Sequence, residues 1–96
     1  MRFDFHPEAE TELLETITYY EDRRPNLGED FSIEFQLAVQ NILSYPRGWP
    51  VIAEEVHRCL VNRFPYGILY SIEPDRVLIL AVMHLHRHPG YWKDRR

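Results

Sequence analysis

The chain has 96 residues, of which 45% are hydrophobic and 14% aromatic, enough apolar surface for one folded core and too few residues for two. The single cysteine, Cys59, excludes an internal disulfide, and no segment approaches the roughly 20 apolar residues of a membrane span. Residues 1–6 are too short and too charged for a signal peptide. We therefore expect one cytoplasmic domain over residues 1–96, with no membrane partner.

The net charge of −4 is divided unevenly along the chain. Residues 1–50 contain 4 Lys/Arg against 10 Asp/Glu, whereas residues 51–96 contain 7 against 5. The acidic total argues against a general nucleic-acid binder. The split indicates either that the two halves face different partners or that helices in the first half carry solvated acidic faces.

The N-terminal residues predict a short strand followed by a helix. Residues 2–6 alternate polar and apolar side chains, as in a strand with one buried face. Pro7 suits the first position of a helix over residues 7–24, where its missing N–H costs nothing, and Pro25 ends that helix. Three glutamates place negative charge near the positive end of the helix dipole: Glu8, Glu10 and Glu12.

A second amphipathic helix follows the short link at residues 25–28. From Phe31 to Tyr45, apolar residues recur at spacings of four, three, four and three residues. So short a link makes the two helices antiparallel neighbours, whose shared apolar side needs a sheet to cover it. Residues 47–50 form a loop by composition.

In the second half the apolar period changes to two. Residues 56–62 and 66–72 predict two strands, and the continuous apolar run at 77–82 predicts a strand inside the sheet, because both its faces must be covered. The expected fold is α+β with the order βααβββ, an N-terminal strand and helical hairpin on a small antiparallel sheet with an aromatic and basic tail. The predicted core shared by helices and sheet is Leu13, Ile17, Phe31, Phe35, Ile42, Ile68, Tyr70, Ile79 and Val82.

Alternation along the strands assigns the two faces of the sheet. Gly67, Leu69 and Ser71 point away from the helices, and by register Arg58 and Leu60 share that outer face. We expect function on this face.

The tail over residues 87–96 interleaves aromatic rings with cations. This combination suits stacking on bases and neutralising phosphates, but Tyr91 and Trp92 suit capping an edge of the core equally well. We expect the arginines at 95 and 96 to be solvated.

Three histidines alternate near the end of the last predicted strand: His84, His86 and His88. In an extended chain they would share one face, as metal ligands do, but no carboxylate or thiol completes the set nearby. We therefore expect no metal and no other cofactor. A polar strand end, or imidazoles acting as acid and base, is the favoured interpretation.

Four groups of short motifs occur in order along nearly the whole chain: Phe5-His6-Pro7-Glu8-Ala9; Tyr19-Tyr20-Glu21 with Pro25 and Gly28; Arg63-Phe64-Pro65-Tyr66 with Ile68 and Tyr70; and Val82-Met83-His84 with Arg87, Pro89, Tyr91 and Trp92. In this order they resemble the RelE/ParE superfamily of toxins from bacterial type II toxin-antitoxin systems, formerly called plasmid stabilization proteins. The resemblance implies the βααβββ fold, a cognate antitoxin that forms a hetero-oligomer with this chain, and growth arrest when the antitoxin is lost.

The RelE-like branch cleaves messenger RNA on the ribosome with strand cations, a late arginine and a tail tyrosine. Leu60 and Gly67 occupy positions where two of these cations are expected, so the set is incomplete. If each positioned group contributes on the order of 10² to 10³ in rate, the loss of two leaves a weak nuclease. In this branch the catalytic candidates are Arg58, His84, His86, Arg87 and Tyr91.

The ParE-like branch poisons DNA gyrase and lacks the nuclease set, and the Arg-Phe-Pro-Tyr and Pro-Gly-Tyr-Trp segments resemble that branch. We therefore favour a toxin that inhibits DNA gyrase and has no catalytic activity of its own. Two alternatives stay open: a metal-independent endoribonuclease acting on ribosome-bound mRNA, and a binding module or orphan toxin with weak activity. The residues expected to bind the target are Arg58, Arg63, Arg87, Tyr91 and Trp92.

Overall fold

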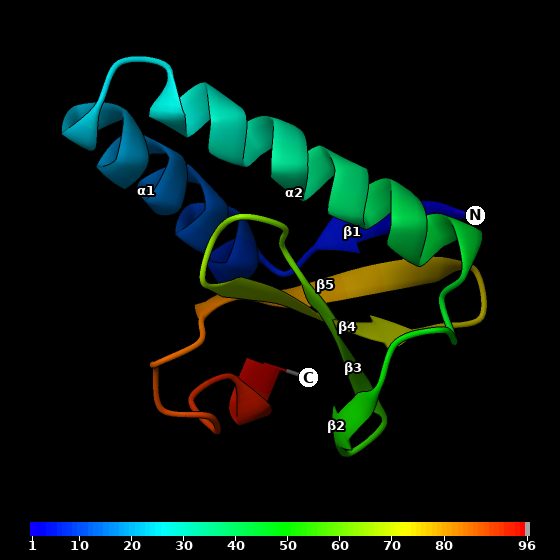
Figure 1. The fold of residues 1–96 in the computed structure, drawn as a ribbon. Coiled ribbons are helices and arrows are strands. Elements are labelled where there is room, and N and C mark those ends of the chain that lie inside the picture. The colour runs from blue at the N-terminus through cyan, green and yellow to red at the C-terminus, as the bar shows by residue number, and fades with distance from the viewer. Residues whose placement is uncertain (96) are drawn as a thin grey trace.

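The computed structural model describes residues 1–95 and has two helices lying on one face of a sheet (Figure 1). This arrangement confirms the predicted α+β class and βααβββ order. One short strand, β2, was not predicted, because three residues are too few to show an alternating pattern. In chain order the elements are β1 (Arg2–Phe5), α1 (Pro7–Arg23), α2 (Leu27–Ser44), β2 (Val51–Ala53), β3 (Val56–Leu60), β4 (Tyr66–Ile72), β5 (Arg76–His84) and the 3₁₀ helix η1 (Lys93–Arg95).

The five strands are arranged in the order β1-β5-β4-β3-β2. β1 runs parallel to β5 and the other neighbours are antiparallel, so the sheet is mixed rather than purely antiparallel. β5 lies between β1 and β4, which confirms that the apolar run belongs to an interior strand. Arg76 at the start of β5 contacts Asp4 of β1 at 3.0 Å and so helps to fix this pair.

The link between the two helices is held by Glu21 of α1. Its carboxylate accepts hydrogen bonds from the N–H groups of Asn26 and Gly28, at 3.0 and 3.1 Å. A Cβ on Gly28 would lie 2.5 Å from the carbonyl oxygen of Ile17, so only glycine allows the helices to approach this closely. Within residues 1–95, neither helix is long and apolar enough to cross a membrane.

The main core lies between the helix pair and the sheet. Seven of the nine predicted core residues are buried there, and Leu13 and Ile17 are half-buried against them, which confirms the predicted set. Ile79 and Val82 both face the helices although they are three positions apart, which would place them on opposite faces of a regular strand. The β4–β5 register shifts opposite Leu69 and Tyr70, and this bulge restores the inward direction of Val82.

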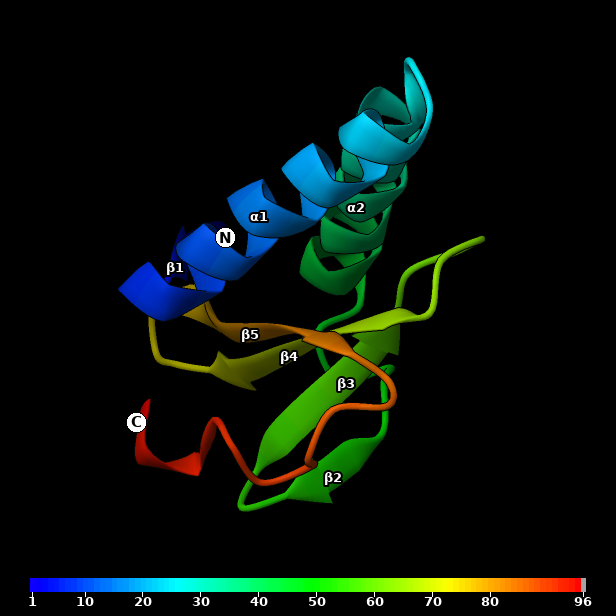
Figure 2. The same ribbon diagram turned by 90° about the vertical axis from the view of Figure 1, so that its left-hand side faces the viewer.

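The outer face of the sheet is covered by the tail, which runs beneath it on the side opposite the helices (Figure 2). Leu69, Leu80 and Met83 form a second core with Trp92, which has no exposed surface. The predicted outward direction of Leu69 is therefore confirmed, but this part of the outer face is buried. Of the two tail structures that the sequence left open, the capping one is observed.

Candidate functional site

Glu12 of α1 is the centre of an ion-pair network that joins α1, β5 and the tail. Arg95 donates two hydrogen bonds to its carboxylate, at 2.9 and 3.0 Å, and the N–H of Val82 donates another at 3.0 Å. Arg95 also donates to the carbonyl oxygen of Leu80 at 3.0 Å. Because β1 pairs with β5 only as far as Ile79, these two side chains satisfy backbone groups along the rest of that edge.

Arg87 and Tyr91 complete the network. The guanidinium carbon of Arg87 lies 3.8 Å from the centre of the Tyr91 ring, and its Nη1 lies 3.7 Å from Oε2 of Glu12. Burial, followed by the adjacent Glu12 carboxylate, raises the pKa of the Tyr91 hydroxyl, which therefore stays protonated at neutral pH. We call Glu12, Arg87, Tyr91 and Arg95 the tail latch.

Two members of the tail latch differ from what the sequence indicated. The side chain of Arg95 is only 7% exposed, so the expectation that it is solvated was wrong. Glu12 was predicted only as a charge near the helix dipole, and its contact with Arg95 spans 83 residues of sequence, which no local pattern can show. Arg96, of which solvation was also expected, lies outside the described residues.

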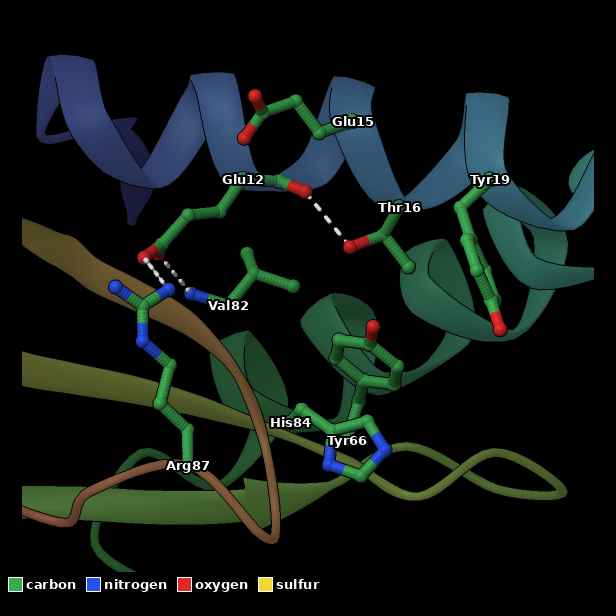
Figure 3. Close-up of a pocket in the computed structure, with 8 residues that line it drawn as sticks. All are labelled: Glu12, Glu15, Thr16, Tyr19, Tyr66, Val82, His84 and Arg87. Carbon is green, nitrogen blue, oxygen red and sulfur yellow. Dashed lines mark hydrogen bonds and ion pairs between the residues drawn. The ribbon is translucent and has the colours of Figure 1, made fainter.

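A pocket of about 320 Å³ opens between α1 and the end of β5 (Figure 3). Its walls include Glu15 and Tyr19 of α1, Tyr66 of β4, and His84 and Arg87. Figure 3 shows His84 beside Tyr66, and their ring centres are 5.1 Å apart. Two nuclease candidates, His84 and Arg87, thus share one pocket, which we call the α1–β5 pocket.

The three histidines do not share one face of a strand, because β5 ends at His84 and the chain then turns. The His84 and His86 rings remain 5.2 Å apart, and Nδ1 of His84 accepts the N–H of His86 at 3.0 Å. In the neutral form this hydrogen bond leaves the proton of His84 on Nε2. No group of three or more His, Cys, Asp or Glu side chains in residues 1–95 is arranged to hold a metal ion.

Arg58 lies in a second pocket of about 370 Å³, formed by the outer face of β3, strand β2 and the tail. Cys59 and Val61 point to the main core, which confirms the predicted register of Arg58. His88 and Lys93 line the same hollow, and sequence analysis did not single out Lys93. We call it the Arg58 pocket.

The five predicted target-binding residues do not form one continuous patch. Arg63 lies in the turn between β3 and β4, has a φ of 73°, and contacts Asp30 of α2 at 3.6 Å. Arg87 and Tyr91 belong to the tail latch, while Arg58 lies in the other pocket. Trp92 is fully buried, so in this conformation it supports the tail from within and offers no contact surface.

Comparisons with known proteins agree with this architecture. The chain resembles a solved structure titled "Chromosomal ParDE TA system from P. aeruginosa", with a TM-score of 0.78, 14% identity, and coverage of 90% of this chain and 97% of that chain. No curated protein matches the chain. At this identity the structural match establishes the fold.

The sequence model of the family described as ParE toxin of type II toxin-antitoxin system, parDE, matches residues 3–89. The chain therefore belongs to the ParE family of type II toxins. The family implies an antitoxin partner.

Proposed function

We propose that this toxin arrests growth by binding and inhibiting DNA gyrase, and that it does so without cutting RNA. Family membership supports this proposal, because the ParE-like branch acts on gyrase. The proposed contact surface is the outer, tail-bearing side of the molecule, with Arg58 in its pocket and Arg87 at its edge beside α1. Trp92 holds the tail in place beneath this surface.

The tail latch is the observation that carries the proposal. RNA cleavage without a metal needs a base, an acid and cations around one phosphate. Here the Arg87 guanidinium already contacts the Tyr91 ring and the Glu12 carboxylate, and the hydroxyl of Tyr91 is buried. His84 lines the α1–β5 pocket, whereas Arg58 lines the other one. Arg58 therefore faces a different hollow from His84 and Arg87, so the full candidate set does not surround one reacting centre.

The raised pKa of Tyr91 also argues against a role as a general base. Burial and the Glu12 carboxylate both favour its neutral form, so little phenolate is present at neutral pH. Among the nuclease candidates, this leaves only His84 and His86 to accept the proton of the 2′-hydroxyl.

Two assays on the purified chain test the proposal. We expect inhibition of the ATP-dependent supercoiling of DNA by gyrase, and no cleavage of message bound to ribosomes over the same time. Addition of the cognate antitoxin should remove the inhibition. Rapid cleavage of ribosome-bound message that is lost in a His84→Ala variant, together with unaffected supercoiling, would instead establish the nuclease.

A further inference from the structure

The Arg58 pocket gathers nitrogen-bearing side chains from three separate parts of the chain. Arg58 comes from β3, His88 from the segment after β5, and Lys93 from the start of η1. The tail lies near β2 and β3, and the burial of Trp92 against the sheet helps to hold it there (Figure 2). This pocket is therefore a product of the folded tail.

The charges in this pocket differ from those of the tail latch. In the latch, Arg87 and Arg95 both contact the Glu12 carboxylate, at 3.7 and 2.9 Å. In the part of the chain that the structure describes, no acidic side chain lies within ion-pair distance of Arg58 or Lys93. Two cations therefore line one hollow in which residues 1–95 pair neither of them with a carboxylate, and this favours an anionic ligand.

Gly67 positions Arg58 for such a ligand. A Cβ at Gly67 would lie 3.2 Å from both Cγ and Cδ of Arg58, closer than an ordinary van der Waals contact. The bare backbone of β4 thus lets the stem of Arg58 lie flat across it. Gly67 occupies a position where a nuclease would carry a cation. Here its missing side chain leaves the space in which the Arg58 side chain packs.

The tail side of the pocket is lined by His88 and Lys93, two side chains that carry hydrogen-bond donors. Nδ1 of His88 accepts the N–H of Gly90 at 3.2 Å, so a neutral His88 ring keeps its proton on Nε2 as a donor. A Cβ at Gly90 would lie 3.6 Å from the His88 ring and 3.8 Å from Cδ of Lys93, both ordinary contacts. Gly90 therefore leaves room between two donor side chains.

The walls of the pocket decide which anion fits. Ile52, Ala53, Met83 and Pro89 supply aliphatic surface. Trp92 contributes to the lining but has 0% exposed surface, so no indole face is available for a base to stack on. Sites for unpaired bases rely on exposed aromatic rings, whereas an aliphatic stem carrying a carboxylate needs only apolar walls and cations. The net charge of −4 also disfavours a nucleic-acid ligand.

We propose that the Arg58 pocket binds a glutamate or aspartate side chain from an acidic segment of the protein target, with Arg58 and Lys93 pairing to its carboxylate. The proposal rests on the proposed function and names the chemistry that the tail-bearing side recognises. Arg58 provides a flat, bidentate donor, and Lys93 adds a mobile positive charge.

The direct test is a titration of the ¹⁵N-labelled full chain, followed by NMR, with an acetylated and amidated Leu-Glu-Glu-Leu peptide. The matched peptide Leu-Gln-Gln-Leu has nearly the same shape and no charge. We expect the amide signals of Gly90 and Lys93 to shift, with the glutamate peptide binding roughly tenfold more tightly than its glutamine counterpart, as charge-assisted hydrogen bonds predict.

Two variants alter the pocket in different ways. The double variant Arg58→Gln/Lys93→Gln removes both charges, and Gly90→Val narrows the hollow and keeps them. Each should weaken binding of the glutamate peptide by roughly tenfold. Arg24→Gln, at an exposed position after α1, is the matched control and should bind like the parent. Thermal melts of all variants establish that each one is folded.

Three results would overturn the pocket assignment: equal binding of the two peptides, parental binding in both pocket variants, or tighter binding of a single-stranded oligothymidylate than of the glutamate peptide. Gyrase assays separate this assignment from the proposed function. If the parent chain inhibits gyrase and the double variant does so equally, the pocket assignment fails and the function stands. If the parent does not inhibit gyrase yet binds the glutamate peptide in the pocket, the function fails and the pocket chemistry is supported.

Discussion

Glu12 joins segments that are far apart in the sequence, because one carboxylate accepts hydrogen bonds from Arg95 and from the backbone of Val82. The side chains of Glu12 and Arg95 are only 11% and 7% exposed, so each depends on the other to offset its lost hydration. An intact buried ion pair contributes little net stability. Removing one partner lowers the free energy of unfolding strongly, because the remaining charge is buried without its partner.

Glu12→Gln should therefore lower the free energy of unfolding by about 3–5 kcal/mol, the range for breaking a buried ion pair. Urea denaturation followed by fluorescence measures this change. Glu10→Gln, at an exposed position on the same helix, should change it by less than about 0.5 kcal/mol. Adding Arg95→Met to Glu12→Gln should recover part of the loss, because no buried charge is then left alone. Equal losses for Glu10→Gln and Glu12→Gln would contradict the role of the latch.

Cys59 makes stability depend on pH in the alkaline range. Burial raises the pKa of its thiol from 9.0 to about 11, so the folded state holds this proton more tightly than the unfolded chain does. The resulting stability is fully present below pH 9 and is lost as the pH rises towards 11. Between pH 8 and pH 10 the parent should lose roughly 1 kcal/mol more than Cys59→Ala. If the free energy of unfolding changes equally in the two proteins between pH 8 and pH 10, the role of the Cys59 thiol is contradicted.

The tail behaves as a structural element rather than as a mobile appendage. Its segment from Pro89 to Arg95 contains the buried Trp92, whose indole N–H donates to the carbonyl oxygen of Pro89 at 2.8 Å, and it ends in the tail latch. Truncation after Pro89 would remove Trp92 and Arg95, the two residues that hold the tail, and would expose the second core. A loss of toxicity in that truncation would consequently not identify a contact surface.

Point substitutions separate the two roles of the tail. Trp92→Ala should lower the free energy of unfolding by about 3–5 kcal/mol, since it removes a large buried ring. The adjacent exposed Lys93→Ala should change it by less than about 0.5 kcal/mol. Guanidinium titration of both variants checks this contrast. A Trp92→Ala protein as stable as the parent would mean that the tail does not cap the sheet in solution.

At the scale of the whole molecule, the helices of the acidic half and the tail of the basic half lie on opposite sides of the sheet (Figure 1). The helices from the acidic half cover one face, and the tail from the basic half covers the other. This arrangement fits the first of the two interpretations of the uneven charge, that the two halves face different partners. We propose that the helix side receives the antitoxin and the tail side the target.

The helix side has two features that suit an antitoxin segment. α2 exposes Ile33 and Leu37, one helical turn apart, with 47% and 49% of their surfaces accessible. β1 is the outermost strand at its end of the sheet, and the groove between β1 and α2 is lined by apolar residues that include Phe3 and Val39. An amphipathic helix can cover the first feature, and an extended segment can pair with the second.

Hydrogen exchange on the toxin–antitoxin complex should accordingly show slower exchange in β1 and α2 than in the free toxin. Leu37→Glu should weaken antitoxin binding at least tenfold, whereas Leu60→Glu, equally exposed on β3, should leave it unchanged. Calorimetric titration measures the affinity of each variant for the antitoxin. Protection confined to the tail side, or a stronger effect of Leu60→Glu, would reverse the assignment of the two faces.

Local patterns determined the two helices and every strand of this protein except the three-residue β2. Pro7 and the spacing from Phe31 to Tyr45 predicted two helices, and alternation around Arg58 and Ile68 predicted strand register, because side-chain direction along a helix or strand follows backbone geometry alone. Whether the tail caps the sheet or exposes its aromatic rings was determined only by the tertiary structure. Trp92 is buried because Leu69 and Leu80 form an apolar surface on the far face of the sheet.

Long-range pairing has no local period, and this is why the candidate site could be predicted only in part. Arg95 is buried because a carboxylate lies within hydrogen-bond distance of it. That carboxylate belongs to Glu12, 83 residues earlier in the chain, so no local pattern around Arg95 indicates it. The hollow around Arg58 likewise exists only after Lys93 and His88 have been carried to it by the folded tail. The packing of the tail brings these residues from distant segments together in the Arg58 pocket. Which residues meet can therefore be known only from the folded chain.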